Sequence, residues 1–79
     1  MIEMKDILEI IIKNLVSDKN AVSINEIEGE NSVTFEVKVA NTDMGKIIGK
    51  QGRTAKSIRT IIKAIALKEQ KKVNIEFID

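Results

Sequence analysis

The stretch that decides the fold is residues 44–59, MGKIIGKQGRTAKSIR. At its centre is Ile47-Ile48-Gly49-Lys50-Gln51-Gly52, an apolar pair followed by two glycines three positions apart. Glycine reaches backbone angles that a β-carbon forbids, so the pair permits a sharp bend and close approach of another backbone. Apolar spacing on either side predicts a short helix over 43–48 and a longer helix from residue 52 or 53 to about 68.

The start of the longer helix is a candidate anion-binding site. The first amide groups of a helix have no partner within it, and the helix dipole adds positive charge there. Lys50 lies in the bend itself, and further cations surround it at Lys46, Arg53, Lys56 and Arg59. We expect Gly49 and Gly52 to allow close approach of a nucleotide backbone and Lys50 to bind phosphate. The other cations would attract and position the strand.

The net charge of +1 conceals an uneven distribution along the chain. Residues 1–43 carry nine acids and four bases, a net −5, whereas residues 44–79 carry nine bases and three acids, a net +6. This polarity indicates a polyanionic partner, although a solvated, lysine-rich helix face explains the charge pattern equally well.

Upstream of the bend, the sequence predicts a helix and a hairpin. The helix covers about 2–17, with an apolar stripe of Met4, Leu8, Ile11 and Leu15. A strand over 22–28 follows, in which Ile27 breaks the alternation and indicates either a bulge or an early strand end. A turn over 29–32 joins it to a clearly alternating strand over 33–39.

Around and beyond the bend, capping and periodicity complete the pattern. Asn41 or Thr42 can cap the short helix, and Asp43 favours its first turn. The core stripe of the longer helix is predicted as Ala55, Ile58, Ile62 and Ile65. A closing strand covers 73–77, and both aromatics, Phe35 and Phe77, fall on apolar strand positions typical of a core. The sequence therefore predicts one αββααβ domain of the α+β class over residues 1–79.

Composition excludes several function classes. With neither cysteine nor histidine, the chain has no disulfide, no thiolate metal site and no histidine base. Four carboxylates around the hairpin are best explained as solvent-exposed strand residues rather than a metal or acid–base site: Glu26, Glu28, Glu30 and Glu36. Ser57 has no base to activate it as a nucleophile. The N-terminal segment has no signal-peptide pattern, and no apolar run approaches the ~20 residues that span a bilayer. We expect a cytoplasmic, non-enzymatic protein with no metal, cofactor, small-molecule substrate or membrane association.

The run Ile47–Gly52 resembles the KH-domain signature, an apolar pair followed by Gly-x-x-Gly. In that family the GXXG loop clamps the backbone of about four single-stranded nucleotides. Two strands before the loop and one after it resemble the type II arrangement, which implies a three-stranded mixed sheet packed on one side by three helices. The family pattern has a larger aliphatic residue where Ala55 stands, and this change either widens the base groove or repacks it.

Over its whole length the chain is similar to the small bacterial single-KH proteins of the KhpA type. The resemblance implies an RNA chaperone acting in post-transcriptional control linked to cell-envelope growth, cell-wall organisation and cell shape. It implies single-stranded RNA as one partner and, as another, a second copy or a larger KH-containing protein. The implied RNA-binding residues are Lys46, Ile48, Gly49, Lys50, Gln51, Gly52, Arg53, Lys56 and Arg59.

The alternative function is a protein-interaction module that uses the fold mainly for dimerisation. Small and aliphatic residues on a second face of the long helix favour a helix–helix contact through Thr60, Ile61, Ala64 and Leu67. The contrary explanation is that Ile61 merely widens the core stripe and Leu67 is a lone exposed leucine.

Overall fold

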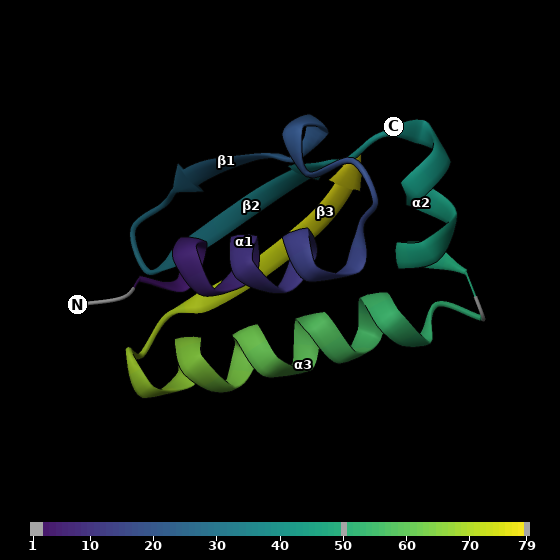
Figure 1. Ribbon diagram of the computed structural model, residues 1–79. Helices are drawn as coiled ribbons and strands as arrows, with labels where there is room; N and C mark the ends of the chain where they lie inside the picture. The colour runs from purple at the N-terminus through teal and green to yellow at the C-terminus, as the bar shows by residue number, and fades with distance from the viewer. Residues whose placement is uncertain (1–2, 50, 79) are drawn as a thin grey trace.

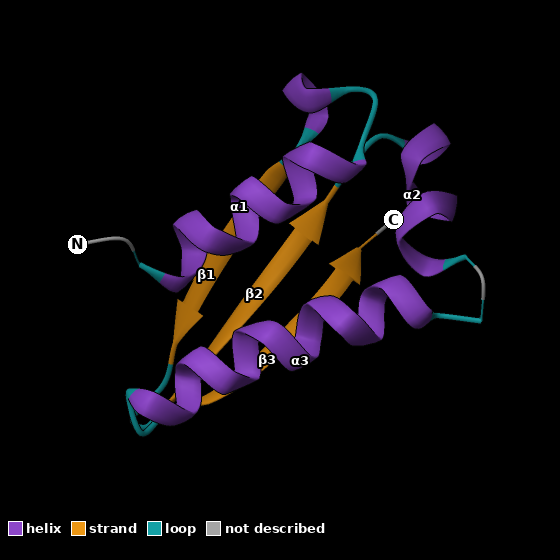
Figure 2. Cartoon of the chain, turned by 60° about the horizontal axis from the view of Figure 1, so that its bottom comes forward, coloured by secondary structure: helices purple, strands orange, loops and turns teal. Residues whose placement is uncertain are grey.

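The computed structural model describes residues 3–49 and 51–78, which form a single three-stranded sheet with helices on one side (Figures 1 and 2). The elements, in chain order, are α1 (Met4–Leu15), a short 3₁₀ turn η1 (Lys19–Ala21), β1 (Ser23–Glu28), β2 (Ser32–Lys38), α2 (Asn41–Ile48), α3 (Arg53–Lys68) and β3 (Lys72–Ile78). β2 lies in the centre, antiparallel to β1 and parallel to β3. This confirms the predicted α+β class and the mixed sheet of a type II KH fold.

The two long helices cover the same face of the sheet, and α2 lies at one end of that layer (Figure 2). Strand alternation turns Val33, Phe35 and Val37 of β2 and Val73 and Ile75 of β3 toward the helices, where all five are buried. The helices bury the following residues against them: Met4, Leu8, Ile12, Met44, Ile47, Ile58, Ile62 and Ala66. Because α2 packs into this core through Met44 and Ile47, the core determines where the glycine bend that follows α2 begins.

The stripe predicted for α1 was partly wrong. Met4 and Leu8 are buried as expected, but the third buried position is Ile12, while Ile11 is half-buried and Leu15 is 39 % exposed. Spacing of four keeps the stripe directly between the sheet and α3, and it continues to Val16 beyond the helix. Residues 10–12 are all isoleucine, so the local pattern did not distinguish these positions.

The bulge or early end predicted for β1 is also wrong. β1 pairs with β2 in one continuous register from Ser23↔Lys38 to Glu28↔Val33. Ile27 pairs with Thr34 on the face away from the helices and is 48 % exposed. Glu26 pairs with Phe35 and therefore shares the helix-covered face.

The start of α2 differs from the expectation, whereas α3 agrees with it. The N-cap of α2 is Ala40, and neither Asn41 nor Thr42 caps the helix, since both lie inside it. α3 begins at Arg53 after Gly52 and buries Ala55, Ile58 and Ile62 as predicted, with Ile65 half-buried and Ala66 added. Of the two aromatics, Phe35 is fully buried and Phe77 is half-buried against the core.

Candidate nucleic-acid interface

The bend between α2 and α3 is a compact turn with its own backbone hydrogen bonds. The Gly49 N–H donates to the Gly45 carbonyl at 2.7 Å, and the Gly52 N–H donates to the Ile48 carbonyl at 2.9 Å. Both Gln51 (φ 62°) and Gly52 (φ 72°) adopt the left-handed conformation. The bend is therefore built as a direct continuation of α2, and its position follows that of α2.

Each glycine of the motif has a steric reason within the turn. A β-carbon at position 49 would overlap the carbonyl oxygen of Gly45 in the last turn of α2. At position 52 the space is open, but the left-handed backbone angle disfavours a residue with a side chain. The turn itself thus accounts for both glycines, and the backbone approach of a ligand stays a prediction.

The surface beside the bend combines uncapped amides with cations. Because the N-cap of α3 is Gly52, no side chain of the described residues caps the first turn, whose amides have no partner within the helix. Arg53 and Lys56 are exposed one helical turn apart next to these amides, and Gln51 and Ile48 are exposed beside them. The prediction for Lys50 lies outside the described residues.

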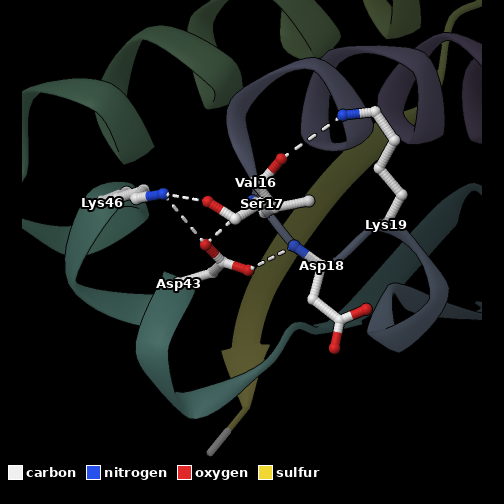
Figure 3. A network of polar contacts seen from close by, with 6 residues as sticks. All are labelled: Val16, Ser17, Asp18, Lys19, Asp43 and Lys46. Carbon is white, nitrogen blue, oxygen red and sulfur yellow. Dashed lines mark hydrogen bonds and ion pairs between the residues drawn. The ribbon is translucent and has the colours of Figure 1, made fainter.

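Lys46 faces away from this group. Its ammonium lies 3.2 Å from the Asp43 carboxylate, three positions earlier in α2, and donates a hydrogen bond to the Ser17 hydroxyl (Figure 3). Side chains on a helix lean toward its N-terminus, which carries this ammonium away from the bend. Lys46 therefore has an internal ion-pair partner in Asp43, whereas no such pair is found for Arg53 or Lys56 among the described residues.

Arg59 is tied to the sheet. Its Nε and one Nη each donate to the Ile75 carbonyl at 3.3 Å, and the guanidinium lies 5.3 Å from the centre of the Phe77 ring. A guanidinium over an aromatic face gains a cation–π contact, and the side chain is half-buried as a result. Arg59 thus lies between α3 and β3 instead of joining the cations at the bend.

Sequence reasoning missed the main role of Asp43. Its carboxylate accepts the backbone N–H groups of Ser17 at 2.9 Å and Asp18 at 3.0 Å (Figure 3). Those two N–H groups, with help from Lys46, outweigh the effect of burial and lower the Asp43 pKa to about 2. An acid in a first turn looks like a dipole-favoured surface residue, so nothing local signalled the distant partners.

Gly45, within α2, was not among the predicted site residues, although its position in a helix is unusual for glycine. Glycine inside a helix is destabilising by roughly 0.5–1 kcal/mol relative to alanine. A β-carbon at position 45 would meet nothing within 4 Å, so no contact within the described protein requires glycine there. The gap leaves the exposed surface of α2 bare, one turn before the exposed Ile48.

A second candidate surface lies on the outer side of α3. The four residues predicted for a protein contact are all exposed, at helical spacings that place them together: Thr60, Ile61, Ala64 and Leu67. Ile61 is 48 % exposed and Leu67 is 78 % exposed. The explanation that Ile61 widens the core stripe is therefore excluded.

Two kinds of site are absent from the part of the chain that the structure describes. Within 3–49 and 51–78, no three or more acidic side chains are grouped so that they could hold a metal ion. In the same ranges, no helix combines the length and the apolar character needed to cross a membrane. Ser57, the serine near the bend, is exposed on α3.

Comparison with known proteins identifies the family. The family model described as KhpA/KhpB, KH domain, matches residues 5–77. RNA-binding protein KhpA of Clostridium perfringens is 56 % identical over 75 residues, covering 95 % of this chain and 100 % of that protein. RNA-binding protein KhpA of Aquifex aeolicus is 46 % identical over 79 residues and 100 % of both chains, and that of Chlamydia trachomatis is 43 % identical over 76 residues, 96 % of this chain and 97 % of that protein. No solved structure shows a significant match. With a matching family model over almost its whole length and relatives this similar, the chain belongs to the KhpA/KhpB KH-domain family.

Proposed function

We propose that this protein is a non-catalytic RNA-binding module that holds single-stranded RNA at the bend between α2 and α3. The observation that carries the proposal is the uncapped first turn of α3 beside the exposed Arg53 and Lys56. Helix N-termini favour phosphate through their free N–H groups and dipole. Three similar proteins named RNA-binding protein KhpA support the same ligand class.

The cations at the site have different tasks in this proposal. Arg53 and Lys56, together with Lys50, attract and hold phosphate groups of the strand. Lys46 contributes less to phosphate binding, because Asp43 already compensates its charge. Arg59 also contributes less to phosphate binding, because its guanidinium already donates to the Ile75 carbonyl and lies over the Phe77 ring.

The exposed side of α2 supplies an apolar contact for a base or ribose. Gly45 leaves that side without a side chain, and Ile48 adds exposed aliphatic surface one turn later. Sheet-stacking recognition is disfavoured, since Phe35 is fully buried and Phe77 is half-buried beneath the Arg59 guanidinium. Sequence discrimination should therefore be modest.

The proposed cellular role comes from the resemblance to the KhpA-type proteins, and weak, sequence-tolerant binding is compatible with it. One loop clamps about four nucleotides, so a single copy binds weakly and pairing raises avidity. We propose that the 79 residues work as one domain in the cytoplasm, as an RNA chaperone in post-transcriptional control of cell-envelope growth and cell shape.

The test of the loop is the double variant Lys50→Asp with Gln51→Asp. Aspartate tolerates the left-handed conformation of position 51 better than most residues, so the fold should survive. A matched control is Lys68→Asp with Gln70→Asp at the other end of α3, since Gln70 has a similar φ of 59°. Fluorescence anisotropy with a labelled single-stranded RNA should show binding abolished by the loop change and retained by the control, with the Tm of the loop variant close to wild type. Equal affinity of the loop variant and wild type would remove the bend from the mechanism.

A second function, protein interaction through α3, is favoured by the exposure of Ile61 and Leu67 with the small residues Thr60 and Ala64 beside them. Large apolar residues flanked by small ones suit close packing of two helices. We propose a second copy of the chain, or a larger KH-domain protein, as the occupant.

This second function is tested with Ile61→Tyr, which adds bulk to the proposed contact. The matched control is Ile10→Tyr on α1, where the isoleucine is 56 % exposed. Light scattering should show a smaller particle only for Ile61→Tyr. If that variant keeps the size of the wild type, the interface lies elsewhere.

A further inference from the structure

A single buried carboxylate fastens α2 to the turn that follows α1. Asp43 is 1 % exposed, and its two oxygens separately accept the N–H groups of Ser17 and Asp18, 26 and 25 residues earlier in the chain (Figure 3). Apart from this link, the described part of α2 is anchored in the core by only two buried side chains, Met44 and Ile47. The polar link therefore accounts for a large part of what holds this short helix in place.

Lys46 and Ser17 complete the network. The Lys46 ammonium contacts the Asp43 oxygen that also accepts the Ser17 N–H, and it donates to the Ser17 hydroxyl. The buried negative charge is thus matched by two backbone donors and one cation, which is the condition under which a buried carboxylate stabilises its surroundings. We call these three residues, with the Asp18 N–H, the α2 clamp.

The clamp is mechanically connected to the bend. The Gly49 N–H donates to the Gly45 carbonyl and the Gly52 N–H donates to the Ile48 carbonyl. These two hydrogen bonds attach the bend to the last turn of α2. Moving or loosening α2 would displace the amides and exposed side chains at the start of α3 relative to Ile48 and Gly45. Such a displacement would weaken RNA binding, because binding groups must be preorganised to bind tightly.

From this geometry we propose that Asp43 is a positioning residue for RNA binding: without touching RNA, its carboxylate sets the place of α2 and so of the bend. The inference rests on the function proposed above. It also changes the role of Lys46 from a phosphate contact to the internal counter-ion of the clamp.

Three roles for Asp43 predict different signs. If Asp43 acted only as a nearby negative charge, its removal would tighten RNA binding. If it served stability alone, its removal would lower the Tm and leave the affinity of the folded protein unchanged. If Asp43 is a positioning residue, its removal must weaken RNA binding even at a temperature where the protein is fully folded.

The experiment compares Asp43→Asn with Asp18→Asn. Both remove one negative charge from the same turn region, but the Asp18 carboxylate is exposed and points away from the network, and its N–H would still donate to Asp43 (Figure 3). The probe is a fluorescent single-stranded RNA of about eight nucleotides, twice the length one loop clamps. If only about a tenth of the molecules keep α2 in place, the affinity of Asp43→Asn falls about tenfold. Asp18→Asn should bind as tightly as wild type or slightly tighter.

Amide hydrogen exchange supplies a readout without RNA. Asp43→Asn should speed exchange in residues 44–49 and 51–54, while exchange in β2 stays as in wild type. Unchanged exchange around the bend, or unchanged or tighter RNA binding by the folded variant, overturns the proposal. If the double loop variant binds RNA like wild type, the proposed function fails, and the exchange result still decides whether Asp43 positions the bend.

A second variant covers the case in which Asp43→Asn does not fold. Lys46→Gln keeps both backbone N–H bonds to Asp43 but removes the ion pair. A clamp role predicts faster exchange around the bend with the salt dependence of RNA binding unchanged, whereas a phosphate contact would lower the salt slope by about 1. The latter outcome would return Lys46 to the phosphate site and contradict the clamp.

Discussion

The two ends of the helical layer shift the pKa of a carboxylate in opposite directions. At the end where α1 stops and α3 starts, Asp43 accepts two backbone N–H groups and an ammonium, and its pKa is lowered to about 2. At the other end, Glu26 lies on the helix-covered face of β1 near Glu28 and Glu3. There burial first, and the neighbouring Glu28 next, raise the Glu26 pKa above its ordinary value of 4.5.

The difference shows that the donors aimed at an acid, more than burial alone, determine whether it holds the fold together. Asp43 is the more deeply buried of the two, yet its charged form is favoured. Glu26 lines a groove that holds three other acids and two cations. The charged side chains of this groove are Glu3, Glu26, Glu28, Glu69, Lys5 and Lys71. In the proposed function, one end of α3 offers amides and cations to RNA, and we expect the groove at the other end, with four acids and two cations, to be unfavourable for it.

The largest effect should come from breaking the bend itself with Gly49→Ala. The added β-carbon overlaps the Gly45 carbonyl oxygen, so the end of α2 must move. Overpacking of this kind costs about 2 kcal/mol, which for a domain this small lowers the Tm by roughly 10 °C. Calorimetry and RNA titration should both register the loss. Gly29→Ala at the acidic end, where the added carbon is crowded by the movable Ser32 hydroxyl and otherwise makes only ordinary contacts, should change either quantity little.

The next effect separates the two carboxylates by pH. The Asp43 pKa lies below its ordinary 3.8, so its stabilising contribution is complete above that value and is lost as pH falls toward about 2. Denaturant unfolding between these values should show wild type losing stability faster than Asp43→Asn. Parallel curves for the two proteins would show that the clamp carries no such charge-dependent contribution.

The cations at the two ends provide a smaller, electrostatic contrast. Lys56→Gln beside the bend should weaken RNA binding several-fold and reduce the slope of log affinity against log salt by about 1. Lys71→Gln in the acidic groove removes the same charge from the far end of α3 and should leave the slope unchanged. Equal effects of the two variants would mean that RNA affinity depends on the net charge of the protein rather than on a specific site at the bend.

Within α2, Gly45→Ala should separate stability from binding. The new methyl group enters open space, so the protein should gain roughly 0.5–1 kcal/mol of stability from the better helix former. RNA affinity should fall modestly, because the bare strip beside Ile48 is covered. A variant that is both more stable and equally good at binding RNA would exclude Gly45 from the interface.

The smallest effect is expected for Glu26→Gln at the acidic end. Because the Glu26 pKa is raised in the folded protein, its charge opposes folding at pH values above 4.5. Glutamine should therefore give a slightly higher Tm at neutral pH, and the difference should disappear as pH falls below 4.5. A lower Tm at neutral pH would show that Glu26 has a favourable partner in solution.

Local sequence alone determined the order αββααβ, the glycine bend, the clean alternation of β2 and most of the α3 stripe. These depend on repeats of two or 3.6 residues and on glycine's backbone freedom, which are properties of short segments. The tertiary structure decided which isoleucine of α1 is buried, that Ile27 faces outward, that Arg59 turns to Ile75 and that Asp43 reaches Ser17. Each of these depends on a partner that is distant in sequence, and a short-range pattern carries no information about which distant donor or side chain the fold will bring alongside.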